Sequence, residues 1–126
     1  MELIPGRVIV ARGDHHLRVG NSSRGVTATL DQGPLVNSCR PAADVLFRSL
    51  AETYRGDVLS VVLTGMGYDG LRGTEALKAA GAYSIAQDQK SSVVWGMPGA
   101  VAQAGLADQV LPLAAIAPEL VRLAER

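Results

Sequence analysis

The chain has 126 residues, of which 48% are hydrophobic and 19% charged, and its formal net charge is zero. These values are typical of one soluble globular domain and exclude a strongly basic nucleic-acid-binding surface. No apolar run approaches the roughly 18 residues of a membrane span, and no charged segment followed by an apolar one suggests a secretory signal. The single cysteine, Cys39, excludes an internal disulfide and fits a reducing, cytoplasmic setting.

The first third of the chain predicts β-structure. Short runs rich in Val, Ile and Leu are separated by turn-forming residues such as Gly13 and Asp14. In the last of these runs, alternating apolar residues and threonines show the period of a half-buried strand. We therefore expect strands at residues 7–11, 16–19 and 25–30, with a loop over residues 21–25.

The rest of the chain alternates between helical and extended patterns. Pro41 suits the first turn of a helix, with Ser38 or Cys39 before it as the cap. Residues 58–63 are almost continuously apolar, which is typical of a strand covered on both faces. The expected elements are a helix from Pro41 to Tyr54, a strand over 58–63, a helix over 71–80 closed by Gly81, a strand over 82–86, a helix over 100–104, a strand over 109–113 and a helix over 118–125. This order favours an α/β fold with helices on the faces of a parallel sheet.

Residues 65–70, GMGYDG, fit the pattern G-x-G-x-x-G between a predicted strand and a predicted helix. Asp88 lies 18 residues beyond Gly70, near the position of the acidic residue that binds a ribose in dinucleotide-binding folds. A dinucleotide-binding domain is therefore one interpretation. Three features oppose it. Asp69 puts a carboxylate where a pyrophosphate would lie, and about 70 residues of β/α alternation are too few for two nucleotide-binding halves. The motif also lies mid-chain, whereas it usually opens a dinucleotide-binding fold.

Asp69 itself has two further interpretations. Sites in open parallel sheets form beyond the carboxyl ends of the strands, where a carboxylate is able to orient a histidine and stabilise its imidazolium form. Alternatively, Asp69 only caps the helix that begins near Leu71, which is a common role for aspartate. The residues alone leave both interpretations open and favour the cap.

Residues 63–70, LTGMGYDG, resemble the LTGMGxDG motif of the CheB family, the chemotaxis receptor methylesterases. The resemblance extends over essentially the whole chain, in order and spacing. It includes PGRVIVA and GDHHL within residues 5–17, CRP, DVLF and Ser49 within residues 39–49, AQD at residues 86–88 and VVWGMP at residues 93–98. The departures are Arg12, Ala42, Ala43 and Trp95, where the family has proline, serine, valine and phenylalanine.

The resemblance implies a doubly wound, mainly parallel, three-layer αβα fold with a β-rich N-terminal part. It also implies an enzyme with a Ser-His-Asp triad that hydrolyses γ-glutamyl methyl esters on the cytoplasmic region of chemoreceptors, with glutamine deamidation in some members. By the same resemblance, Asp69 is the triad aspartate, while Met66 and Gly67 line the site and the Met66 backbone N–H stabilises the oxyanion. No cofactor or metal is expected.

The family's nucleophilic serine and catalytic histidine lie in ASTGG-like and QHM-like motifs, and neither motif occurs in these residues. His15 and His16 are expected to be solvated turn residues, and Cys39 a buried or capping-region thiol, since no metal-ligand spacing links them. We therefore expect residues 1–126 to be a single domain, an incomplete catalytic domain without its N-terminal segment, inactive alone. The alternative is a non-catalytic binding module that self-associates through exposed sheet edges.

Overall fold

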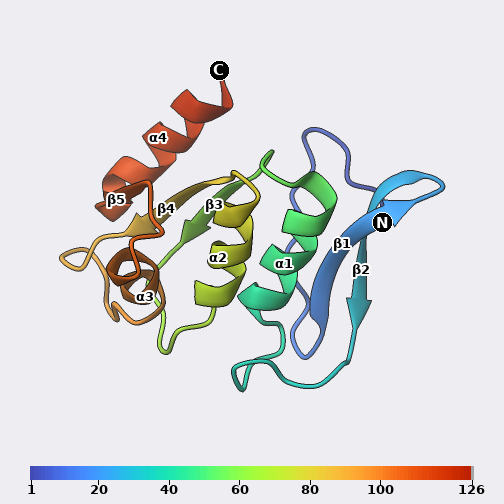
Figure 1. Ribbon diagram of the computed structural model, residues 1–126, viewed down its shortest axis with the longest axis horizontal. Helices are drawn as coiled ribbons and strands as arrows, with labels where there is room; N and C mark the ends of the chain where they lie inside the picture. Colours follow the sequence, from blue (N-terminus) through green and yellow to red (C-terminus); the bar gives the residue numbers. More distant parts are fainter. Residues whose placement is uncertain (126) are drawn as a thin grey trace.

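A computed structural model describes residues 1–125 and contains an N-terminal hairpin beside a parallel sheet with its helices (Figure 1). The hairpin pairs β1 (His16–Ser22) with β2 (Gly25–Asp31) in antiparallel fashion. The parallel sheet has the order β3-β4-β5, formed by β3 (Leu59–Val62), β4 (Tyr83–Gln87) and β5 (Gln109–Leu111). The helices are α1 (Ala43–Tyr54), α2 (Leu71–Ala79), α3 (Met97–Gln103) and α4 (Leu113–Ala124).

The parallel sheet has helices on both faces, which confirms the expected three-layer α/β arrangement. Val62 of β3 packs against Val101 of α3 in the hydrophobic core. Leu59 of the same strand points the other way and lines a cavity together with Leu123 of α4. Because side chains alternate between the two faces of a strand, α3 and α4 cover opposite faces of the sheet.

Helix α1 joins the hairpin to the parallel sheet. The Ser49 hydroxyl accepts a hydrogen bond from the Val19 N–H at 2.9 Å, and Thr53 Oγ1 donates to the Val19 carbonyl at 3.1 Å. These bonds satisfy backbone groups of β1, so α1 covers this part of the hairpin. On its other side α1 packs against α2, where Gly73 lets the two helices approach closely.

The N-terminal predictions are confirmed in part. The strands expected at residues 16–19 and 25–30 both form and extend further than predicted. The loop expected over residues 21–25 is shorter, because Ser22 Oγ accepts the Arg24 N–H at 3.1 Å and supports a tight turn. No helix within residues 1–125 is long and apolar enough to cross a bilayer.

The strand predicted at residues 7–11 is wrong. This segment forms no strand, and Val8 and Val10 are 88% and 86% exposed. A strand is stable only beside a neighbour that completes its backbone hydrogen bonds. Within residues 1–125 no neighbouring strand pairs with this segment, so its alternating apolar pattern does not by itself produce a strand.

The order of the later helices and strands is confirmed, with shifted ends. Helix α1 begins at Ala43 rather than Pro41, and neither Ser38 nor Cys39 caps it. Helix α3 begins at Met97, three residues before the predicted start at residue 100. Helix α4 begins at Leu113 rather than at Pro118, the predicted start. Pro118 lies inside the helix, where a proline removes one backbone hydrogen bond without ending every helix. Gly81 follows the end of α2, as expected for the residue that closes this helix, and has a left-handed φ of 97°.

Replacing Gly73 by alanine is expected to destabilise the protein. The added Cβ would lie 2.5 Å from the Phe47 Cβ and 3.1 Å from the Asp44 Cα. Overpacking costs about 1–3 kcal/mol, which exceeds or offsets the gain of about 1 kcal/mol in helix propensity. Urea unfolding measures the difference. Gly13→Ala is the matched control, since no atom lies within 4 Å of its added Cβ and we expect a change below about 0.5 kcal/mol. A Gly73→Ala protein more stable than the wild type would contradict the close packing of α1 on α2.

Candidate functional site

Two loops meet at the carboxyl ends of β3 and β4. Gly65 and Trp95 form a parallel bridge, and Thr64 exchanges two hydrogen bonds with Val94, each at 2.9 Å. Gln87, the last residue of β4, accepts the Thr64 N–H at 2.8 Å. The first part of the loop over residues 63–70 is therefore bound to the loop that follows β4, at the edge of the sheet where parallel folds form their sites.

Close packing between these loops accounts for part of the glycine-rich pattern. A Cβ on Gly96 would lie 2.8 Å from the carbonyl oxygens of both Gly65 and Gly67. A Cβ on Gly65 would lie 2.5 Å from Met97 Sδ. The atoms facing Gly96 belong to the backbone, so the close approach of the two loops requires glycine there, whereas the flexible Met97 side chain facing Gly65 is able to move.

Asp69 is 7% exposed and directs its carboxylate to the N-terminus of α1. Oδ2 accepts the Ala43 N–H at 2.6 Å, and Oδ1 accepts the Asp44 N–H at 3.1 Å. The expectation that Asp69 caps the helix following it is therefore wrong, because Asp69 caps α1 instead. The physical reason is Gly70, which occupies the cap position of α2 with a left-handed φ of 101° and has no side chain to bond with. Ala42, the cap residue of α1, also lacks a capping side chain.

Asp44 completes a reciprocal arrangement. This residue is 1% exposed, and its Oδ1 accepts the Gly70 N–H at 3.0 Å and the Gly73 N–H at 2.7 Å. The carboxylate in the first turn of α1 thus caps α2. The N–H groups at the start of α2 are those a pyrophosphate would bind, and Asp44 occupies them, which removes the physical basis of the dinucleotide interpretation.

The Asn37 side chain connects the two carboxylates. Its Nδ2 donates to Asp44 Oδ2 at 2.7 Å and to Asp69 Oδ1 at 3.0 Å. Within residues 1–125, no lysine, arginine or histidine forms an ion pair with either aspartate. The two negative charges are therefore stabilised by helix N-termini and one amide, without a cationic side chain.

Met66 and Gly67 lie on the exposed part of the same loop. The Met66 side chain is 83% exposed, and Gly67 has a left-handed φ of 88°. Within the described chain, the Met66 N–H has no hydrogen-bond partner. An oxyanion hole requires an N–H donor of this kind, fixed in position and not already bonded.

The prediction for His16 is wrong, because its side chain is fully buried at the start of β1 rather than solvated in a turn. Its Nε2 donates to the Pro34 carbonyl at 2.8 Å, and its Nδ1 accepts the Ala42 N–H at 3.3 Å, which assigns the proton to Nε2. His15 is partly exposed and places Nδ1 2.9 Å from the Gly13 carbonyl. Neither histidine bonds Asp69.

The remaining candidates have local partners. Cys39 is partly buried, as expected for a thiol near a cap, and its Sγ bonds the Asn37 carbonyl. Asp88 accepts hydrogen bonds from the Ser91 hydroxyl at 2.6 Å and the Ser91 N–H at 3.0 Å, and these two bonds lower the pKa of Asp88. In the part of the chain that the structure describes, no three metal-binding side chains come together.

Sequence reasoning missed Asn37 and Asp44 as members of this site. The available signal for Asp44 was its place in the first turn of a predicted helix, where carboxylates are favoured. The sequence does not reveal that its side chain reaches the start of α2. Asn37 gave only the signal of a turn residue, because its two acceptors are distant in sequence.

Comparison with known proteins agrees with this fold. The family model described as CheB methylesterase matches residues 1–120. A Nitrobacter hamburgensis protein named protein-glutamate methylesterase/protein-glutamine glutaminase is 54% identical over 119 residues, which cover 94% of this chain and 31% of that protein. A Maricaulis maris protein of the same name is 53% identical over 123 residues, which cover 98% of this chain and 31% of that protein.

The structural comparison gives the same family. The crystal structure of the Thermotoga maritima CheB methylesterase catalytic domain matches with a TM-score of 0.85 at 40% sequence identity, over 88% of this chain and 59% of that chain. The matches to the Nitrobacter and Maricaulis proteins cover 31% of each, so this chain spans less than a third of the length of these two curated relatives. With the family model matching residues 1–120, the chain belongs to the CheB methylesterase family.

Proposed function

We propose that the chain supplies the aspartate of a Ser-His-Asp triad that hydrolyses γ-glutamyl methyl esters on the cytoplasmic region of chemoreceptors. Deamidation of glutamine is a second reaction of the same centre. The names of the relatives, protein-glutamate methylesterase/protein-glutamine glutaminase, support both reactions. The serine and the histidine come from outside residues 1–126, so the chain is one part of a catalytic domain and is inactive alone.

The hydrogen bonding of Asp69 carries this proposal. A carboxylate has about four lone-pair positions, and Asp69 uses three of them for the donors of Asn37, Ala43 and Asp44. Two of these donors bond Oδ1, while Oδ2 has only the Ala43 N–H. Oδ2 therefore retains a position for an imidazole N–H, at the edge of the sheet where substrates bind.

The chemistry follows the general scheme of serine hydrolases. The serine oxygen attacks the ester carbonyl while the histidine takes its proton, and Asp69 stabilises the imidazolium that forms. In the proposed mechanism the Met66 N–H, beside Gly67, donates to the oxyanion, a contribution typically worth about 3–4 kcal/mol of barrier. The histidine then gives this proton to the methoxy oxygen as its bond to the carbonyl carbon breaks, so that methanol leaves and an acyl-enzyme remains. Water hydrolyses the acyl-enzyme, with the histidine first accepting a proton from the water and then returning one to the serine.

Asp69→Asn is expected to abolish nearly all activity of a reconstituted enzyme. The chain is joined to the part of the Thermotoga maritima catalytic domain outside the structural match, and methanol release from methylated receptor is measured. An asparagine stabilises the wrong imidazole tautomer, and in serine hydrolases this change lowers kcat by about 10⁴-fold.

Two controls accompany this experiment. The chain alone releases no methanol under the proposal. Asp31→Asn removes the surface ion pair with Arg18 and keeps an oxygen that accepts the Gly33 N–H, so it should leave the reconstituted rate within about twofold. Unchanged activity of Asp69→Asn would remove Asp69 from the mechanism.

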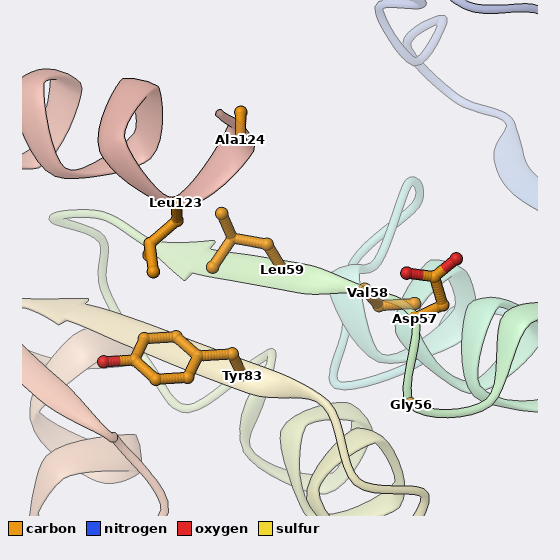
Figure 2. Close-up of a pocket in the computed structure, with 7 residues that line it drawn as sticks. All are labelled: Gly56, Asp57, Val58, Leu59, Tyr83, Leu123 and Ala124. Atoms are coloured by element: carbon orange, nitrogen blue, oxygen red, sulfur yellow. The ribbon is translucent and has the colours of Figure 1, made fainter. Parts of the chain in front are cut away.

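A second candidate function is binding through the free edge of β3. Within residues 1–125, β3 pairs with β4 on one side only. Beside it lies an open cavity of about 550 Å³, in which Leu59 and Tyr83 from the sheet face Leu123 of α4 (Figure 2). An unpaired strand edge is a template for pairing with another chain, and in this second candidate function the partner at the edge is a second copy of the chain.

Self-association predicts a concentration-dependent dimer that a charge on β3 disrupts. Leu59→Lys puts an ammonium group at the edge and into the cavity, and sedimentation equilibrium should then report monomer only. Val93→Lys is the control, because Val93 is 91% exposed and lies outside both β3 and the cavity. A wild-type chain that stays monomeric at high concentration contradicts this second function and leaves the catalytic proposal standing.

A further inference from the structure

We infer that Asn37 is a positioning residue for Asp69, one that determines which carboxylate oxygen remains open to the histidine. The inference rests on the proposed function. It starts from the amide that bonds both Asp44 Oδ2 and Asp69 Oδ1. By bonding Oδ1, which also accepts the Asp44 N–H, Asn37 leaves Oδ2 as the less occupied oxygen.

The charges around this amide explain why a donor is needed there. Asp44 and Asp69 share the Nδ2 group of Asn37, so their carboxylates are neighbours, and like charges repel strongly where water is scarce. Within residues 1–125, neither carboxylate forms an ion pair with a cationic side chain. Without the amide, the carboxylates are expected to rotate apart, and Asp69 Oδ1 would keep only the Asp44 N–H.

A simpler explanation for the asparagine is the backbone turn that contains it. Val36 and Cys39 pair across this turn through hydrogen bonds of 3.0 and 2.8 Å. Asn37 and Ser38 between them have left-handed φ angles of 54° and 61°. Tight turns with two such residues favour Asn, Asp and Gly. Turn formation therefore explains the residue type, but it does not require the side chain to reach two carboxylates.

Asn37→Gly separates these two roles, because glycine suits the turn and lacks the amide. Ser38→Gly is the matched control at the neighbouring left-handed position, whose side chain bonds neither aspartate. In ¹H–¹⁵N spectra of the 126-residue chain, Asn37→Gly should shift the amides bonded to the two carboxylates, whereas Ser38→Gly should not. These amides belong to Ala43, Asp44, Gly70 and Gly73. If all four amide resonances keep their wild-type positions in Asn37→Gly, the inference is overturned.

A second variant tests the same contact with the side-chain shape kept. Asn37→Asp preserves the turn preference and replaces the amide donor by a carboxylate, which repels the carboxylates of Asp44 and Asp69, so it should shift the same four amides. In the reconstituted enzyme, Asn37→Gly should lower kcat by about 10- to 100-fold with KM unchanged, the size of loss that follows a small misplacement of a reacting group. The imidazole N–H resonance that reports the bond to Asp69 should also move.

The outcomes distinguish this inference from the proposed function. An active Asp69→Asn enzyme refutes the function. The positioning role alone is refuted by a different result. In that case Asp69→Asn is inactive, but Asn37→Gly has the same kinetics and the same imidazole resonance as Ser38→Gly. A reduced kcat with a shifted imidazole resonance in Asn37→Gly, and neither change in Ser38→Gly, supports both.

Discussion

The candidate site depends on one interaction, the exchange of caps between Asp69 and Asp44. Asp69 bonds the first N–H groups of α1, and Asp44 bonds those at the start of α2. Helix N-termini leave several N–H groups without partners and carry a partial positive charge, so each carboxylate satisfies donors and gains from the helix dipole. Because each aspartate belongs to the segment that the other caps, loop 63–70 and the start of α1 fix one another's positions.

The surrounding structure serves this pair of caps. Gly73 lets α1 and α2 approach closely enough for the exchange, and the buried His16 bonds the Ala42 N–H just before the first residue of α1. From the other side, the loop after β4 binds Thr64 and packs through Gly96. Asp69 is therefore held in one orientation by bonds from within the chain, ready for the histidine of the proposed triad. Such preorganisation is how enzymes stabilise developing charge without rearranging at the moment of reaction.

The sequence predicted the parts of this arrangement that depend on local pattern. Alternation and apolar runs located the hairpin, the parallel strands and the helices, and the resemblance singled out Asp69. Contacts between distant segments were not predictable, since the cap on α1 comes from a residue 26 positions later in the chain. The same limit explains His16, whose burial depends on the loop containing Pro34. Residues 7–11 failed for the opposite reason, because a strand pattern without a paired neighbour does not form a strand.

In the proposed triad, Asp69 Oδ2 accepts a hydrogen bond from a histidine outside this chain. The most direct test is a crystal structure of the chain joined to the complementary part of the Thermotoga maritima catalytic domain. We expect an imidazole nitrogen at about 2.6–3.2 Å from Asp69 Oδ2, with the bonds from Ala43, Asp44 and Asn37 retained. An imidazole bonded to another carboxylate, or a histidine far from Asp69 while the exchanged caps stay intact, would contradict it.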